Sequence, residues 1–160
     1  RVLVAVLQGA RKPVSSREAM ERSRLTSPYF AQWVTSSADL FDEGCAALER
    51  RDIERLGRVI RLSYLSMFGT MFTSDPPVVY WLPASVAVIR LCEQLRADAV
   101  PVWETMDAGP QVKLVTVATA VDRVTSAIQA AVPEARVITS GVGAGPTVRH
   151  ETAGGASRFG

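Results

Sequence analysis

A single acid stands between two apolar runs in the second half of the chain. The segment Asp107-Ala108-Gly109-Pro110 is flanked by residues 100–106 and 112–118, which have the composition of strands. Asp can hydrogen-bond its own backbone, Gly accepts a positive φ and Pro cannot continue a ladder, so the segment predicts a hairpin turn. A carboxylate held at a strand end, close to a backbone N–H of the turn, could act on a substrate proton. The alternative is an ordinary hairpin in which Asp107 only satisfies the turn.

A second candidate site lies at the predicted start of a helix. Ser15 and Glu18 have the spacing of a capping box, so we expect a helix from about Ser16 to Leu25. The first turn of such a helix presents free N–H groups and the positive end of its dipole. With Arg17 in that turn, the site could hold a phosphate through backbone donors and a guanidinium together. The alternative is a well-capped helix without a ligand.

Length and charge limit the class of protein. At 160 residues and 48% hydrophobic, the chain is long enough for one filled core and short for two domains. Its 18 basic and 16 acidic residues are spread along the chain, so we expect no nucleic-acid or membrane partner. Sixteen of the bases are Arg, which suits anionic ligands because a guanidinium forks onto phosphate and carboxylate. A high-GC genome would produce the same bias.

Cysteine usage and hydropathy indicate the compartment. Cys45 and Cys92 are isolated within helical patterns, so we expect two buried, reduced thiols and neither a disulfide nor a metal site. No apolar run reaches membrane-spanning length and no signal peptide is visible, so a cytoplasmic protein is expected. His150, the only histidine, adjoins the C-terminal segment and is a poor candidate for a general base.

Apolar residues that recur every three and four positions predict further helices. Ser27 and Asp52 are the expected N-caps of the first two, and Pro83 and Thr119 mark the starts of the others. The helices expected on this pattern cover about residues 28–48, 53–70, 83–98 and 119–132. Paired prolines between Met67 and Tyr80 predict a long loop. A loop of this length in a compact domain suggests a functional role.

The order of the elements indicates the fold class. Residues 1–7 form a continuous apolar run that predicts a buried central strand covered on both faces, and 135–139 predicts a short strand. Strand, helices, hairpin, helix and strand in this order indicate an α+β sandwich, with helices packed on one side of a mainly antiparallel sheet. We expect one domain over 1–148, preceded by more protein, and a flexible tail over 149–160. Gly141–Pro146 lacks the Lys-Ser/Thr ending of a phosphate loop and predicts a flexible turn, after which a short strand could follow.

Four segments together resemble one enzyme family. VSSREAM over residues 14–20, Thr26-Ser27, residues 67–70 followed by Pro76-Pro77, and TMDAGP over 105–110 occur in the order and approximate spacing of mevalonate diphosphate decarboxylases, members of the GHMP kinase superfamily. The resemblance covers about residues 2–145 and only the C-terminal half of such an enzyme. It therefore implies a GHMP-kinase C-terminal-type fold.

The resemblance also implies an activity. Such enzymes convert (R)-5-diphosphomevalonate to isopentenyl diphosphate, ADP, phosphate and CO2 in the mevalonate pathway of isoprenoid, sterol and lipid biosynthesis. ATP and Mg²⁺ would be bound mainly by the N-terminal half, so this chain alone is expected to be inactive. The implied partners are a diphosphorylated small molecule and a second copy of the protein in a homodimer.

Site residues follow from the resemblance by position. Asp107 matches the catalytic aspartate beside the substrate's 3-hydroxyl, and Ser16 belongs to the same catalytic group. Ser16, Arg17 and Met20 match residues that line the substrate and its diphosphate, and Ala108 matches a backbone contact. The resemblance implies no nucleotide-binding or metal-binding residue in this chain.

Two positions depart from the family pattern. Phe68 stands where many members carry His, which could alter substrate preference or only repack the long loop. Gln111 stands where they usually carry Asn and keeps the amide. A phosphomevalonate decarboxylase, a mevalonate-kinase-like relative and a non-catalytic ligand-binding domain of the same fold are the alternatives. Asp107 favours decarboxylation, because relatives that only phosphorylate differ at this position.

Overall fold

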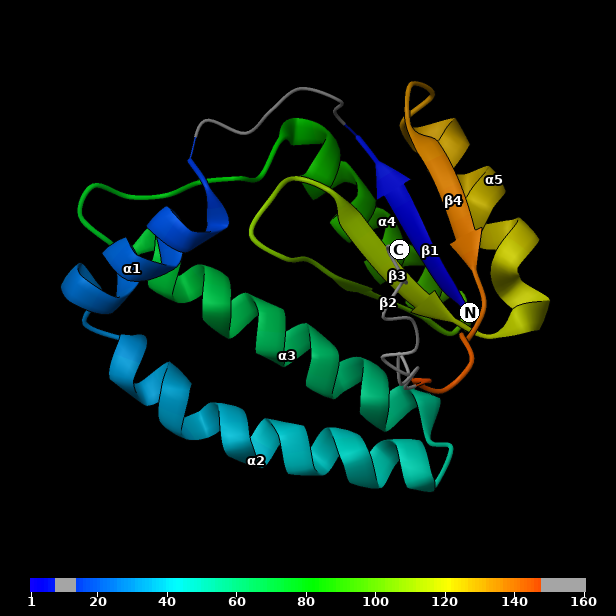
Figure 1. Ribbon diagram of the computed structural model, residues 1–160. Coiled ribbons are helices and arrows are strands. Elements are labelled where there is room, and N and C mark those ends of the chain that lie inside the picture. Colours follow the sequence, from blue (N-terminus) through cyan, green and yellow to red (C-terminus); the bar gives the residue numbers. More distant parts are fainter. Residues whose placement is uncertain (8–13, 148–160) are drawn as a thin grey trace, which may run out of the picture.

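A four-stranded antiparallel sheet lies at the centre of the computed structural model, which describes residues 1–7 and 14–147 (Figure 1). Within these residues the strand order is β2-β3-β1-β4, and every neighbouring pair is antiparallel. The strands are β1 (Val2–Val6), β2 (Val102–Thr105), β3 (Val112–Thr116) and β4 (Arg136–Ser140). The predicted α+β class is confirmed.

Helices cover one face of the sheet and one of its edges. In Figure 1, α4 and α5 lie behind the sheet. Helices α2 and α3 form an antiparallel pair alongside β2, and α1 lies at the left-hand end of this pair. A short 3₁₀ turn, η1 (Ala118–Ala120), leads into α5. The helices are α1 (Ser16–Thr26), α2 (Phe30–Glu49), α3 (Ile53–Phe72), α4 (Pro83–Ala97) and α5 (Val121–Ala131).

Strand register divides the sheet into a buried face and a more open one. Leu3 lies opposite Leu114 and Ala5 opposite Val112, and all four are fully buried beneath the helices. The alternate residues of β1 point to the other face, where Val2 is 37% exposed. The prediction of a central strand is confirmed. The prediction that both of its faces are covered is wrong for the described residues, because an unbroken apolar run does not reveal that the described helices pack on one face of the sheet.

The core lies between the sheet and the α4–α5 layer and continues beneath α3. Cys92 of α4 is fully buried there, and burial raises the pKa of its thiol to about 12. Cys45 of α2 is exposed, so the prediction of two buried thiols is wrong for this residue. The cause is the peripheral position of α2, which packs mainly on α3 and has Ala47 as its buried residue.

N-cap side chains set the starts of two helices, α1 and α3. Asp52 caps α3 as predicted, since its Oδ1 accepts a hydrogen bond from the backbone N–H of Arg55 at 2.9 Å. Ser27, however, is not the N-cap of α2, which begins three residues later. Its backbone N–H instead donates to the carbonyl of Ser23 and closes α1, while its Oγ accepts from the N–H of Tyr29. Ser27 therefore ends one helix without starting the next.

The predicted loop between Met67 and Tyr80 is shorter than expected. Helix α3 continues through Gly69 and ends at Phe72, because a single glycine weakens a helix without stopping it. Residues 141–147 form no helix or strand, and the expected tail, His150 and the possible strand after Pro146 lie outside the described residues.

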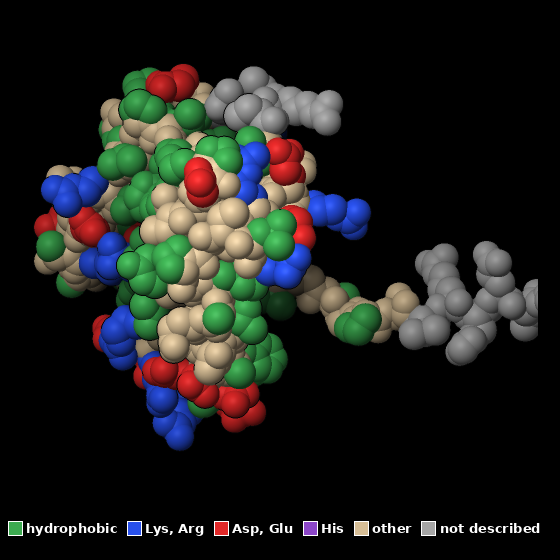
Figure 2. Space-filling model, turned by 90° about the vertical axis from the view of Figure 1, so that its left-hand side faces the viewer, with side chains coloured by type: hydrophobic (Ala, Val, Ile, Leu, Met, Phe, Trp, Pro, Cys, Tyr) green, Lys and Arg blue, Asp and Glu red, His purple; other side chains and the backbone are tan. Residues whose placement is uncertain are grey.

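Charges of both signs are interspersed on the surface. Figure 2 shows basic and acidic side chains side by side over the face seen from the left of Figure 1. Elsewhere in the described part of the chain such charges form ion pairs, for example Arg55 with Glu43 at 3.1 Å. Among the described helices, none combines the length and the apolar composition needed to cross a membrane.

Two glycines of α3 yield opposite predictions for stability. A Cβ on Gly57 would overlap the indole ring of Trp103 on β2, so Gly57→Ala should destabilise the fold by about 1–3 kcal/mol. A Cβ on Gly69 would meet no atom within 4 Å, so Gly69→Ala should stabilise the helix by about 0.5–1 kcal/mol. Thermal unfolding of both variants measures the difference, and equal effects would contradict the close contact between α3 and β2.

Candidate active site

Asp107 follows the end of β2 and opens the turn to β3. The two strands pair in the predicted hairpin, with Thr105 opposite Lys113. The N–H of Gly109 donates to the carbonyl of Asp107 at 2.7 Å and tightens the turn. The Asp107 side chain is 83% exposed. The carboxylate is therefore presented to solvent at the end of a strand, where a ligand can reach it.

Neighbouring elements hold this turn from two sides. Ser85, in the first turn of α4, is fully buried, and its Oγ donates to the carbonyl of Pro110 at 2.7 Å. The amide of Gln111 reaches the end of β1, where its Oε1 accepts from the N–H of Leu7 at 2.6 Å. The position of Asp107 is thus coupled to both α4 and β1.

Glu104 anchors β2 three residues before Asp107. Its carboxylate is fully buried and accepts hydrogen bonds from Arg61 Nε at 2.5 Å, Arg96 Nη1 at 2.8 Å and the Tyr64 hydroxyl at 3.2 Å. The hydrogen bond with Glu104 raises the pKa of Arg61, and burial raises the pKa of Tyr64. A buried carboxylate is tolerated only with such partners, so this network ties β2 to α3 and α4.

Helix α1 begins at Ser16, as the sequence predicts. Ser15 is its N-cap, with Oγ accepting from the N–H of Glu18 at 3.2 Å. The reciprocal contact of a capping box is not formed. Glu18 instead pairs with Arg22 one turn later, at 3.0 Å, because opposite charges four residues apart face each other on a helix.

The segment between α3 and α4 fixes both ends of α1. At the start, the hydroxyl of Tyr80 donates to the carbonyl of Val14 at 2.9 Å. At the end, the Oγ1 of Thr26 accepts from the N–H of Asp75 at 2.8 Å. The structural role of this segment is therefore to position the helix that carries Ser16 and Arg17.

Arg17 carries an available charge at the start of α1. The acids of the helix are engaged by other arginines, Glu18 by Arg22 and Glu21 by Arg24, and the hydrogen bond from Arg24 lowers the pKa of Glu21. Within the described part of the chain no ion pair involves Arg17, which is exposed. A guanidinium at a helix N-terminus suits an anionic ligand.

Ser16 and Asp107 meet in one pocket. Its volume is about 340 Å³, and its lining comprises Ser16, Asp107, Ala108, Gly109, Pro110, Gln111 and Lys113. Ser16 also lines a second pocket of about 660 Å³, together with Arg17, Met20, Glu21, Arg24 and Phe30. The structure thus brings the predicted residues Ser16, Asp107 and Ala108 together and places Arg17 and Met20 in a neighbouring pocket that shares Ser16.

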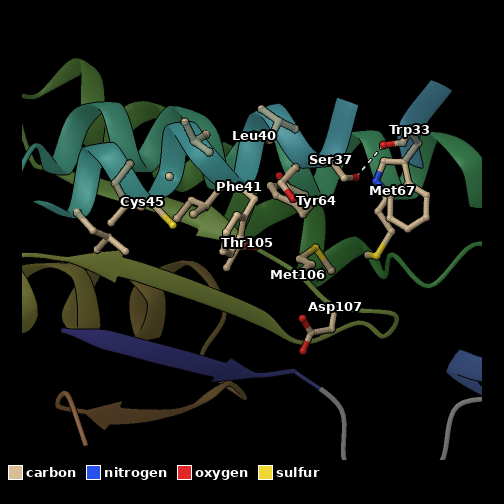
Figure 3. Close-up of a pocket in the computed structure, with 16 residues that line it drawn as sticks. Trp33, Ser37, Leu40, Phe41, Cys45, Tyr64, Met67, Thr105, Met106 and Asp107 are labelled. Atoms are coloured by element: carbon tan, nitrogen blue, oxygen red, sulfur yellow. Dashed lines mark hydrogen bonds between the residues drawn. The ribbon is translucent and has the colours of Figure 1, made fainter. Parts of the chain in front are cut away.

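An apolar groove also ends at Asp107. It measures about 490 Å³ and runs between the α2–α3 pair and the hairpin. In Figure 3, Leu40 and Phe41 of α2 form one wall of the groove, Met106 lies below them, and the Asp107 carboxylate lies at the bottom, below Met106. The acid therefore stands where a polar pocket and an apolar groove meet.

Three residues that support this site were not predicted from the sequence. Lys113 pairs with the Asp107 carboxylate through its ammonium group, Ser85 holds the turn and Glu104 anchors the strand. Lys113 could have been identified from the sequence, since it is the one charged residue in an apolar strand. Ser85 contacts Pro110, 25 residues away in sequence, and Glu104 contacts Arg61, 43 residues away, as well as Arg96, 8 residues away.

Phe68, one of the two departures from the family pattern, belongs to the core. It is fully buried, and its ring centroid lies 5.4 Å from that of Trp81 and 5.6 Å from that of Phe72. Phe68 is not among the residues that line the pocket of Asp107, and its contacts are those of a core residue.

Comparison with known proteins shows the family of this chain. The family model described as "Mevalonate 5-diphosphate decarboxylase C-terminal domain" matches residues 2–151. The chain belongs to this family. A diphosphomevalonate decarboxylase of Aspergillus fumigatus is 31% identical over 116 residues, and one of Eremothecium gossypii is 27% identical over 117. These alignments cover 69% and 71% of this chain, but only 28% and 30% of the two decarboxylases.

Solved decarboxylase structures share the fold. A mevalonate pyrophosphate decarboxylase from Streptococcus pyogenes superimposes with a TM-score of 0.83 and 31% identity, over 92% of this chain and 46% of that one. The protein MDDEF, solved with MVAPP, AMPPCP and magnesium, gives a TM-score of 0.79 and 29% identity, over 85% and 42%. The chain thus spans less than half the length of these decarboxylases, and its GHMP-kinase C-terminal-type fold is confirmed.

Removing the charge of Glu104 should loosen this arrangement. In Glu104→Gln the neutral amide cannot balance the positive charges of the two guanidinium groups. We therefore expect a loss of about 2–3 kcal/mol in the free energy of unfolding. This is less than the 3–5 kcal/mol typical of a broken buried pair, because both arginines reach water. Glu93→Gln, which removes a half-exposed partner of Arg61, should cost less than about 1 kcal/mol. Urea denaturation measures both, and equal losses would contradict the anchoring role.

Proposed function

We propose that this chain is the C-terminal part of an ATP-dependent decarboxylase that converts (R)-5-diphosphomevalonate to isopentenyl diphosphate, ADP, phosphate and CO2. The observation that carries the proposal is the shared pocket of Ser16 and Asp107, formed by segments about 90 residues apart within a matched family domain. The names of the relatives support the same reaction class. A phosphomevalonate decarboxylase is the alternative that substrate assays separate from it.

In this proposal, Asp107 acts on the tertiary 3-hydroxyl of the substrate. Phosphorylation of that hydroxyl requires an aligned nucleophile more than a strong base, because the transition state of phosphoryl transfer is loose. An exposed carboxylate on a turn that is held from two sides can accept the hydroxyl proton and orient the oxygen. Departure of the phosphate then leaves positive charge at C3, which drives loss of the carboxylate as CO2.

The start of α1 would bind the anionic end of the substrate. Arg17 would grip the diphosphate, and Ser16 would contact the substrate between Arg17 and Asp107, because it lines both pockets. Met20 is partly buried against the core and would supply an apolar wall. Ala108 would contribute a backbone contact from the turn.

ATP and Mg²⁺ would be bound mainly by the N-terminal half of the enzyme. The structure of MDDEF with AMPPCP and magnesium supports use of both by the family. Among the described residues of this chain, no group of three His, Cys, Asp or Glu side chains could hold a metal ion. The Asp107 carboxylate already pairs with Lys113, so we assign no metal ligand here.

A cytoplasmic homodimer is the assembly that we propose for the complete enzyme. Two free cysteines and a reaction that consumes ATP suit the cytoplasm. Apolar side chains at the surface of α2, with Phe41 70% and Leu48 60% exposed, suit contact with further protein.

Substitution of Asp107 tests the central role. In the full-length protein, Asp107→Asn should lower kcat for CO2 release by about 10²–10⁴-fold, because an amide cannot accept the hydroxyl proton. Binding of diphosphomevalonate should change little. Release of CO2 is measured with ATP and magnesium, using the mono- and diphosphate substrates side by side.

A matched control uses another acid in an exposed turn. Glu134→Gln, between α5 and β4, should retain the wild-type rate. Wild-type turnover in Asp107→Asn would remove Asp107 from the mechanism.

Substitution of Arg17 tests the anionic end of the site. Arg17→Ala should raise the apparent KM for diphosphomevalonate by about 10–100-fold, which corresponds to the 1.5–3 kcal/mol typical of a hydrogen bond to a charged group. Arg17→Lys should recover only part of this, since an ammonium lacks the fork geometry. Arg90→Ala, at an exposed position of α4, is the control. An unchanged KM in Arg17→Ala would show that this residue is only a surface charge.

A further inference from the structure

Lys113 reaches from the middle of the sheet into the pocket of Asp107 and Ser16. Its backbone lies in β3, between Thr105 of β2 and Val4 of β1, so it is held in the ladder on both sides. Its side chain is only 32% exposed, against 83% for Asp107. The cation is therefore the more buried member of the pair, and the acid on the turn is the more exposed one.

The ammonium group of Lys113 contacts one specific oxygen of the acid. Nζ donates to Oδ2 of Asp107, which favours one rotation of the carboxylate about its last bond. Both residues line the pocket that also contains Ser16. An ion pair placed inside a ligand pocket can direct the carboxylate toward a bound molecule.

Stability alone does not account for this contact. Exposed ion pairs contribute about 0–1 kcal/mol, so loss of this pair would affect folding little. A displacement of about 1 Å in a reacting group, in contrast, can cost about 100-fold in rate. The consequence of the pair should therefore appear in turnover more than in the free energy of unfolding.

We propose that Lys113 is the positioning residue for Asp107: it binds Oδ2 and turns the carboxylate so that the other oxygen meets the 3-hydroxyl of the substrate. The inference rests on the proposed function, since it requires that Asp107 act on that hydroxyl. Lys113 moves no proton itself and acts only through Asp107.

A double-mutant cycle in the full-length enzyme tests this role. Lys113→Met removes the charge and keeps the length of the stem, and should lower kcat by about 10–100-fold with KM for diphosphomevalonate within about twofold of wild type. Lys113→Arg should recover part of the loss. In an Asp107→Asn background, Lys113→Met should cause no further loss in single-turnover rate, because residues that act as a unit are not additive.

The control removes another exposed pair that joins two elements. Arg123→Met breaks the contact of α5 with Asp98 at the end of α4, at 3.7 Å, and should leave turnover unchanged. The melting temperature is measured for every variant and should differ little between Lys113→Met and Arg123→Met.

Several results would overturn the proposal. A wild-type kcat in Lys113→Met would show that Asp107 needs no such partner. A raised KM with an unchanged kcat would show that the ammonium binds the substrate directly. Equal losses in the presence and absence of Asp107, or a loss that follows the melting temperature, would indicate an independent or a purely structural effect. Absence of CO2 release by the wild-type enzyme would instead refute the proposed function itself.

Discussion

The buried carboxylate of Glu104 is the interaction on which the arrangement of the site depends. Strand β2 lies at the edge of the sheet, with β3 as its strand neighbour, so its other side must be held by side chains. Arg61 and Arg96 supply that attachment from α3 and α4. A one-residue slip of β2 would turn Glu104 to the opposite face and break both pairs. Because Asp107 follows three residues later, the network that sets the register also sets where the acid emerges.

The site is built from two short segments that carry little structure of their own. The turn of Asp107 is tied to α4 through Ser85 and to β1 through Gln111, while the loop after α3 holds both ends of α1. The functional groups stay exposed, and the groups that position them are buried or hydrogen-bonded. With this arrangement, a carboxylate and a guanidinium can face solvent while the segments that carry them are held in place.

Local signals in the sequence predicted most elements, and they failed where a choice depended on a distant partner. Asp52 caps a helix as expected because its partner lies three residues away. Ser27 has an equally suitable side chain, yet it closes α1 instead of opening α2. Cys45 lies in the same kind of apolar pattern as Cys92, but α2 packs on little besides α3 and leaves it exposed. Cap chemistry and periodicity are local, whereas burial depends on which elements meet.

The sequence by itself determined the α+β class, the hairpin with Asp107 at its turn and the helix start at Ser16, because turn and cap chemistry act over three or four residues. Its motifs also indicated the family. Only the tertiary structure decided that Ser16 and Asp107 share a pocket, that Phe68 belongs to the core and that Lys113 pairs with the acid. Those relations join residues on different elements. Strand register and helix packing determine them, and neither can be deduced from a local sequence pattern.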